Sequence, residues 1–341
     1  MKPMKPLTVL CRPLIPLGLL FLPLMAAFPV AALEVDFDPE AAAPGNMRFA
    51  WIHGSISAKH NTDVRVQVHR YNEHSYILRQ NPAVHWEAPF MYLLFGAERA
   101  LLIDTGATEE AEYFPIRETV DRLIERWQVA NGVSGIKLLI LSTGDAPAQT
   151  AGTDQFRERA ATSILAIGDG LPESPFVKGE TDGTGTIDLG GRRLSLLPTP
   201  GVSAAGLSVY DPYTDFLFTG TALLPGRIVI RDFDSYKASL ERLLTFGREH
   251  PMKWVMGAHI DMSAAPGVDY RLRSNYRPHE RALQLPVASL KRCYDVVNLI
   301  NGARRAEILA DFIVMNGMGR GERLYGYPGY TPEFLEQRFL R

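Results

Sequence analysis

The run KLLILS at residues 137–142 constrains the fold most, because an unbroken apolar stretch this short predicts a strand buried on both faces. A helix predicted over residues 115–128 precedes it. The apolar positions of that helix fall on one stripe and are Ile116, Val120, Leu123, Ile124 and Trp127. Before the helix, ALLIDTGAT predicts another apolar strand, with Asp104 at its end and a turn through Gly106. Strand, helix and buried strand in this order indicate an α/β layer.

The rest of the chain extends this pattern. Between residues 47 and 95, four short runs rich in β-branched and aromatic residues predict strands: MRFAWIHG, VRVQVHRY, SYILRQ and MYLLFG. In the second half, TIDLGGRRLSLLPTP and LSVYDPYTDFLFTG predict hairpins, residues 235–249 predict a helix, and WVMGAHI predicts a strand. Two βα-rich halves with helices outside and sheets inside predict an α/β fold of the four-layer αββα sandwich type.

The first 33 residues have the layout of a secretory signal peptide. Three cations, Lys2, Lys5 and Arg12, precede an uncharged run that ends in small residues, Val30-Ala31-Ala32. An uncleaved membrane anchor is the alternative, but repeated prolines suit a signal core better than a spanning helix. We therefore expect a signal peptide over residues 1–32, one domain over 33–265 and a C-terminal extension over 266–341 that packs on the same domain. An exported chain, periplasmic or extracellular, without stable membrane insertion after cleavage follows from this interpretation.

Charge and cysteine content exclude some functions. The net charge of −2 becomes about −5 without the leader (33 basic against 38 acidic residues), which gives no reason to expect nucleic acid as a partner. Cys11 leaves with the leader, and Cys293 then stands alone, so no internal disulfide is possible. Cys293 falls on the apolar face of a helix predicted over residues 287–300 and is expected to be a buried structural thiol.

Two further features receive structural interpretations. The Gly-rich run GMGRGERLYGYPGY at residues 317–330 lacks the strand and helix that a nucleotide-binding loop needs, and is predicted to be a surface loop. Most histidines lack ligand-like spacing and are expected to be surface or hydrogen-bonded structural residues: His53, His60, His69, His74 and His85. His250 ends a predicted helix, where a cation interacts favourably with the helix dipole.

Several segments resemble metallo-β-lactamase-fold hydrolases. LLIDTGA is similar to the strand and turn in which Asp104 would orient a metal ligand, and LLILSTGDAPAQTAGTDQF is similar to the family's HxHxDH segment. LLPTPGVSAAGLSVYDPYTDFLFTGTALLPGRI is similar to the TPGH segment and the hairpin that follows it, and GAHID to the last ligand-bearing strand end. The order and spacing of these segments imply the αββα fold.

The resemblance also implies that most metal ligands have been replaced. The former metal-ligand positions are Gly144, Ala146, Ala148, Gln149, Val202, Thr221 and His259, of which only His259 keeps its ligand type. A hydrolytic zinc centre needs three protein ligands and an open position for water. Glycine, alanine and valine have no side-chain donor, and the neutral oxygens of Gln149 and Thr221 suit zinc poorly. Zinc, the metal expected of the family, is therefore predicted not to be bound, and no other cofactor is expected.

Alternatives remain open at this stage. A weak metal site could be built from Asp104, Gln149, Thr221 and His259. A metal-free hydrolase could use Ser203 or Thr221 as nucleophile with His259 as base and Asp104 as orienting group, acting on an ester, thioester or lactone. Asp145 lies between two former ligand positions, and strand alternation would turn it the opposite way.

The favoured hypothesis is a pseudoenzyme. The sequence leaves open whether the chain has any enzymatic activity and favours none. Its vestigial pocket would consist of Asp104, Asp145, Gln149, Ser203, Thr221 and His259 and would bind an unknown small molecule or protein. Loss of carboxylates and imidazoles that only a metal would neutralise should stabilise the metal-free fold. The family includes β-lactamases, thioesterases, sulfatases and lactonases, so the fold alone would not fix a substrate.

Overall fold

The computed structural model describes residue 37 and residues 44–167 and 171–320. By contacts the chain divides into residues 1–31 and residues 32–341, and every element named below belongs to the second unit. The predicted signal peptide lies outside the described residues.

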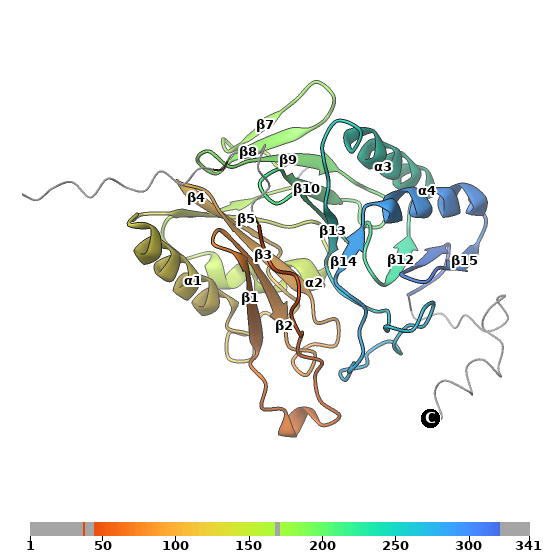
Figure 1. Ribbon diagram of the computed structural model, residues 1–341, viewed down its shortest axis with the longest axis horizontal. Coiled ribbons are helices and arrows are strands. Elements are labelled where there is room, and N and C mark those ends of the chain that lie inside the picture. Colours follow the sequence, from red (N-terminus) through yellow and green to blue (C-terminus); the bar gives the residue numbers. More distant parts are fainter. Residues whose placement is uncertain (1–36, 38–43, 168–170, 321–341) are drawn as a thin grey trace, which may run out of the picture. The chain divides into compact units, whose positions relative to one another are not determined.

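Two sheets form the centre of this unit (Figure 1). The first has six strands in the order β1-β2-β3-β4-β5-β6. Their bounds are β1 Val66–Asn72, β2 Ser75–Gln80, β3 Phe90–Phe95, β4 Arg99–Ile103, β5 Lys137–Leu141 and β6 Thr162–Leu165. Strands β4, β5 and β6 are parallel, and the strands from β1 to β4 pair antiparallel. The apolar run of β5 lies inside this sheet and is buried from Leu138 to Leu141, as the sequence predicts.

The second sheet has seven strands in the order β14-β13-β11-β10-β9-β8-β7. Their bounds are β7 Val177–Gly179, β8 Gly185–Asp188, β9 Arg193–Pro198, β10 Leu207–Asp211, β11 Phe216–Gly220, β13 Trp254–Gly257 and β14 Gln284–Pro286. Both predicted hairpins are present, β8 with β9 and β10 with β11. Strand β14 comes from the C-terminal part of the chain and pairs antiparallel with β13.

The helices cover the outer faces of the two sheets. Helix α1, Ile116–Asn131, lies on the first sheet and ends at Gly132, whose left-handed backbone (φ 66°) suits a glycine. Helices α3, Phe233–Phe246, and α4, Ala288–Ile300, lie against the second sheet. Asp232 caps α3 by accepting a hydrogen bond from Ser235 N, which explains why this helix begins earlier than its apolar stripe predicts. The short helices are η1 Ala58–His60, α2 Pro147–Thr150 and η2 Ala151–Phe156.

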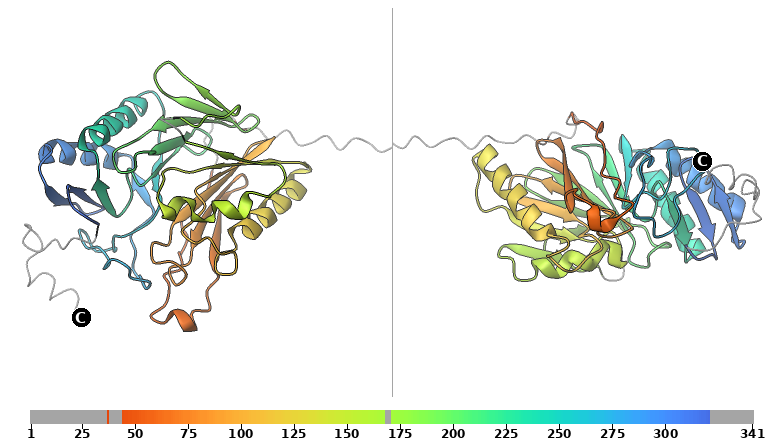
Figure 2. Two further views of the ribbon diagram at one scale, coloured as in Figure 1. Left: turned by 180° about the vertical axis from the view of Figure 1, so that it is seen from behind. Right: turned by 90° about the horizontal axis from the view of Figure 1, so that it is seen from below.

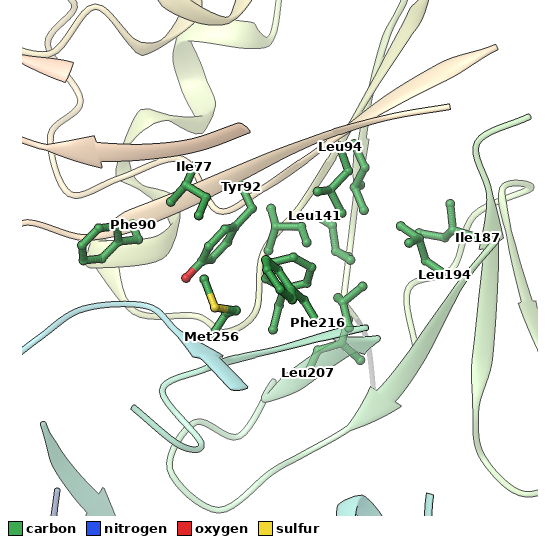
Figure 3. Packing of buried hydrophobic residues seen from close by; sticks show 14 of the residues in the cluster. Ile77, Phe90, Tyr92, Leu94, Leu141, Ile187, Leu194, Leu207, Phe216 and Met256 are labelled. Atoms are coloured by element: carbon green, nitrogen blue, oxygen red, sulfur yellow. The ribbon is translucent and has the colours of Figure 1, made fainter. Parts of the chain in front are cut away.

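Three apolar layers hold these elements together. The middle layer lies between the two sheets, where Tyr92 and Leu141 from the first sheet face Phe216 and Met256 from the second (Figure 3). A second layer joins the outer face of the first sheet to α1, and a third joins the second sheet to α3 and α4. The order helix, sheet, sheet, helix, visible in both views of Figure 2, is the predicted αββα sandwich.

Two parts of the architecture differ from the prediction. Residues 47–53, predicted to form a strand, are irregular, with a single bridge at Gly54. The segment lies along β1 through side-chain bonds instead of a ladder, since Gln67 Oε1 accepts from Ile52 N and Gln67 Nε2 donates to Ala50 O. A third sheet, β12 Arg227–Ile230, β16 Ile313–Asn316 and β15 Arg305–Ile308, was not predicted. Its parallel pair β12–β16 joins residues that are distant in sequence, so no local pattern reveals it.

The buried histidine and cysteine side chains have structural partners. His74 Nδ1 accepts from Trp127 Nε1 at 3.0 Å, and burial lowers the pKa of His74 to about 4. Tyr236 Oη and Cys293 Sγ lie 3.2 Å apart, and burial raises the pKa of this thiol to about 12. The structure thus confirms that Cys293 is a buried structural thiol.

Within the described part of the chain, no helix combines the length and apolarity that a membrane crossing requires.

Candidate functional site

Asp104 stands where β4 ends, at the edge to which the parallel strands bring their carboxyl ends. Its backbone is left-handed (φ 62°), an uncommon conformation for a residue with a side chain. The carboxylate accepts from Thr143 N at 2.7 Å and from Thr143 Oγ1 at 2.8 Å. Burial raises the pKa of Asp104 to about 7 against these two hydrogen bonds, which favour the charged form.

The network continues from Thr143 to Gln149 on α2. Gln149 is fully buried, and its Nε2 donates to Thr143 Oγ1 at 2.5 Å. The backbone oxygen of Gln149 accepts from Thr105 N at 2.8 Å. Asp104, Thr143 and Gln149 therefore form one connected chain of hydrogen bonds, in which Thr143 was not singled out from the sequence.

A side chain at Gly144, the first ligand position that the resemblance implies, would require the Gln149 side chain to shift. A Cβ atom at this position would lie 2.6 Å from Gln149 Oε1 and 3.1 Å from Ser203 Oγ. The Gln149 amide is held by Thr143, so a histidine at residue 144 would have to displace it. The packing around Gly144 and Gln149 is thus adjusted to the replaced residues.

The remaining positions implied by the resemblance have different surroundings. Val202 packs against the apolar layer between the second sheet and its helices. Ser203 Oγ donates to Asp145 Oδ1 at 2.6 Å, so the exposed Asp145 reaches the loop beside Val202. Ala148 is buried, while Ala146 and Thr221 are half-buried.

His259 follows strand β13 and is almost completely buried. Its Nε2 lies 2.7 Å from Arg320 Nη2 and 3.4 Å from Asp261 Oδ2. A guanidinium can only donate, so His259 Nε2 is the acceptor of this hydrogen bond. The other ring nitrogen, Nδ1, has no hydrogen-bond partner among the described residues.

Arg320 brings a cation to His259. Its Nη2 also donates to Asp261 Oδ1 at 3.0 Å, its Nη1 pairs with Glu87, and its guanidinium carbon lies 4.9 Å from the centroid of the Trp86 ring. Burial would raise the pKa of Asp261, but the charge of Arg320 holds it well below its usual range. Residues 317–320 form a loop, as predicted, in which Gly317 and Gly319 are exposed, whereas Met318 is buried and Arg320 contacts His259. The rest of that run lies outside the described residues.

The residues of the hypothetical metal-free triad are not brought together. Asp104 binds Thr143, Ser203 binds Asp145, and His259 binds Arg320. No hydrogen bond among the described residues joins any two of the three. The structure thus separates a nucleophile from its base.

The residues around His259 also do not fit a zinc ion. The atom that would coordinate the metal, His259 Nε2, accepts a hydrogen bond from a cation. Across the described ranges, no three His, Cys, Asp or Glu side chains lie close enough to hold one metal. His259 and Asp261 instead accept hydrogen bonds from the guanidinium of Arg320.

A family model described as the metallo-beta-lactamase superfamily matches residues 144–259. The match covers 116 of the 341 residues, and over this stretch the chain is similar to metallo-beta-lactamases. The matched stretch begins at Gly144 and ends at His259, the first and last of the former ligand positions. The match supports, over these residues, the resemblance expected from the sequence.

Solved structures similar to the chain are themselves metallo-beta-lactamases. TMB-1 is 13% identical, with 70% of this chain and 100% of that chain covered and a TM-score of 0.44. The metallo-beta-lactamase from Pontibacter korlensis is 20% identical, with 62% and 96% covered and a TM-score of 0.42. The one from Erythrobacter litoralis is 13% identical, with 69% and 97% covered and a TM-score of 0.47. No curated protein matches the chain.

Two cavities lie away from the former ligand positions. One of about 360 Å³ is polar and is lined by residues including Arg65, Asn81 and Tyr113. The other, of about 590 Å³, lies between β1 and α1 and is lined by residues including Arg70, Tyr76 and Arg126. Neither cavity includes a residue of the predicted site.

Proposed function

We propose that the chain is a non-catalytic binding protein, a pseudoenzyme that has kept the metallo-beta-lactamase fold without its metal-dependent hydrolysis. The observation that carries the proposal is the guanidinium of Arg320 at His259 Nε2. A cation at this atom disfavours a second, divalent cation through direct charge repulsion. The imidazole that the family would use for zinc thus serves as an acceptor for an arginine.

The chemistry of the surrounding residues supports the same proposal. Hydrolysis in this fold needs a metal-bound water or another activated nucleophile. Ser203, one of the two candidate nucleophiles in the alternative scheme, donates to the exposed Asp145 and has no imidazole bonded to it among the described residues. The Asp104 carboxylate and the Gln149 Nε2 amide are paired through Thr143 without a metal, while Gln149 Oε1 has no hydrogen-bond partner among the described residues.

Export is part of the proposal and rests on the sequence. Lys2, Lys5 and Arg12 before the uncharged run, together with the small residues at its end, support a cleaved leader. The mature protein would then act in the periplasm or outside the cell. Its buried single thiol needs no disulfide partner there.

A hydrolysis assay of residues 33–341 tests the proposal. Ester, thioester, lactone and β-lactam substrates are each incubated with the wild type and with His259→Ala and Ser203→Ala. We expect rates equal to buffer for all three proteins, and likewise for the control variant His279→Ala, which alters an exposed imidazole. Turnover by the wild type that disappears in His259→Ala or Ser203→Ala would overturn the proposal in favour of an altered hydrolase.

A further inference from the structure

We propose that Trp86, Glu87, His259 and Asp261 form a guanidinium site that binds the arginine side chain of a partner peptide, and that Arg320 occupies this site from within the chain. The inference rests on the proposed binding function, whose ligand class it names. The contacts of Arg320 carry the inference, because its guanidinium is the same chemical group as that of the proposed ligand.

The contacts recognise a guanidinium group and not only a positive charge. Nη1 pairs with Glu87, while Nη2 donates to both His259 and Asp261. The guanidinium carbon lies over the Trp86 ring, 4.9 Å from its centroid. A planar fork of donors with a stacking face can satisfy two carboxylates and an imidazole together, whereas a lysine ammonium is a single point charge.

The site is held in place without Arg320. Asp261 Oδ2 accepts from Arg227 N at 3.0 Å, and Asp261 N donates to Pro225 O at 2.9 Å. Between the two site residues, Arg277 Nη1 donates to the carbonyl of Ile260 at 2.5 Å. The strand end that carries His259 and Asp261 is thus fixed by its own hydrogen bonds.

The other half of the site is anchored in the same way. Glu87 N is 3.3 Å from His85 Nδ1, and Ala88 N donates to His85 O at 2.9 Å. The turn that presents Trp86 and Glu87 is therefore closed by contacts that do not involve Arg320. A site built before its occupant arrives loses little order when the occupant leaves.

The charges make an empty site unfavourable. Asp261 is 3% exposed, and its side chain faces Arg320 on one side and the backbone of Arg227 on the other. Removal of the guanidinium leaves this buried carboxylate without its cation, which is costly. Another guanidinium should therefore enter whenever Arg320 is absent or displaced.

Arg320 belongs to the same chain as the site, and this determines how tightly the wild type should bind a free arginine ligand. A group on the same chain competes at an effective concentration on the order of millimolar or higher. A free arginine ligand therefore binds the wild type weakly, and a variant without the Arg320 side chain more tightly. The tether gives a partner peptide the means to exchange with Arg320.

Calorimetric titration with arginine amide, in the presence of a chelator, tests the inference on the mature chain. We expect Arg320→Ala to bind arginine amide at least about tenfold more tightly than the wild type. We expect Arg320→Ala to show no comparable binding of lysine amide, and the added variant Glu87→Gln to weaken the arginine signal. Arg292→Ala is the matched control, because it removes another carboxylate-paired arginine, bonded to Asp311, on the surface.

The outcomes separate this inference from the proposed function. Folded Arg320→Ala that shows no arginine amide binding at about 10 mM, or that binds lysine amide equally, would overturn the guanidinium site. If Arg320→Ala does not fold alone, recovery of its folding by arginine amide and not by lysine amide supports the site, and failure of both overturns it. Failure of the proposed function would appear in the separate hydrolysis assay.

Discussion

Arg320 Nη2 lies 2.7 Å from His259 Nε2 and 3.0 Å from Asp261 Oδ1, so one nitrogen of the guanidinium joins the retained histidine to a buried carboxylate. The contact places a cationic group at the imidazole nitrogen of the retained histidine. It also links residues that lie on different sheets of the unit, since Arg320 follows β16 and His259 follows β13.

Removing either partner of the Arg320–Asp261 pair should destabilise the protein. Arg320→Met leaves the buried Asp261 carboxylate without this cation, at a cost on the order of 3–5 kcal/mol. Asp261→Asn should cost less, because Arg320 keeps Glu87 as a partner. The double variant should lose less than the sum, with a coupling energy of about 1–3 kcal/mol from urea unfolding. The exposed pair Arg193–Asp188 is the control and should couple by less than about 1 kcal/mol. Strict additivity at Arg320 and Asp261 would contradict the contact.

Asp104 should make stability fall as pH rises. Its folded pKa of about 7 lies above the ordinary 3.8, so the folded state binds more protons between these values. Stability from this group is therefore present below about pH 4 and is lost as pH approaches 7. Asp104→Asn resembles the protonated side chain. Its free energy of unfolding should therefore fall less with pH than that of the wild type, by a few kcal/mol across this range.

Urea unfolding of both proteins between about pH 4 and pH 8 measures the Asp104 difference. Asp234→Asn, at an exposed aspartate in the first turn of α3, is the control and should keep the wild-type slope. Parallel curves for the wild type and Asp104→Asn would show that the Asp104 carboxylate ionises as it does in water.

Gly144→Ala should be destabilising although alanine is a small residue. The added Cβ would lie 2.6 Å from Gln149 Oε1, and overpacking of this kind costs about 1–3 kcal/mol. Gly144→Ala combined with Gln149→Ala should recover part of the loss, as measured by urea unfolding. Gly179→Ala serves as the control, since its Cβ would make an ordinary 3.7 Å contact with Leu171. A Gly144→Ala protein as stable as the wild type is the contrary result.

Cys293 should resist thiol reagents in the folded protein. Burial raises its pKa to about 12, so almost no thiolate forms at neutral pH. We expect a chromogenic disulfide reagent to react only after unfolding in urea. Rapid labelling of native protein, at a rate equal to that in urea, would show that the helix face of Cys293 is open.

The layered fold could be predicted because its sequence signals either involve neighbouring residues or resemble segments of a known family. The apolar run of β5 and the stripes of α1 and α4 need only neighbouring residues to be interpreted. The irregular segment before β1 was misjudged because its β-rich composition reflects packing along an edge strand and not ladder pairing. The small third sheet was missed because β12 and β16 meet only in space.

For the site, the resemblance implied ligand positions at Gly144 and Val202, but the contacts around these two residues could not be predicted. Arg320 lies in a Gly-rich run whose composition indicates a surface loop, and nothing in that run shows that its cation returns to His259. Asp261 lies two residues after His259 in GAHID, and its carboxylate is the sequence feature that could have indicated a cation near His259. The role of Thr143 between Asp104 and Gln149 follows from geometry alone.

The metal content of the mature chain tests the central claim most directly. Residues 33–341 are produced with zinc present, freed of loosely bound ions by gel filtration, and measured by native mass spectrometry beside the Arg320→Ala variant. The account predicts well under one zinc per chain for the wild type, because Arg320 holds His259. One tightly bound zinc per wild-type chain, released only by a strong chelator, would contradict it.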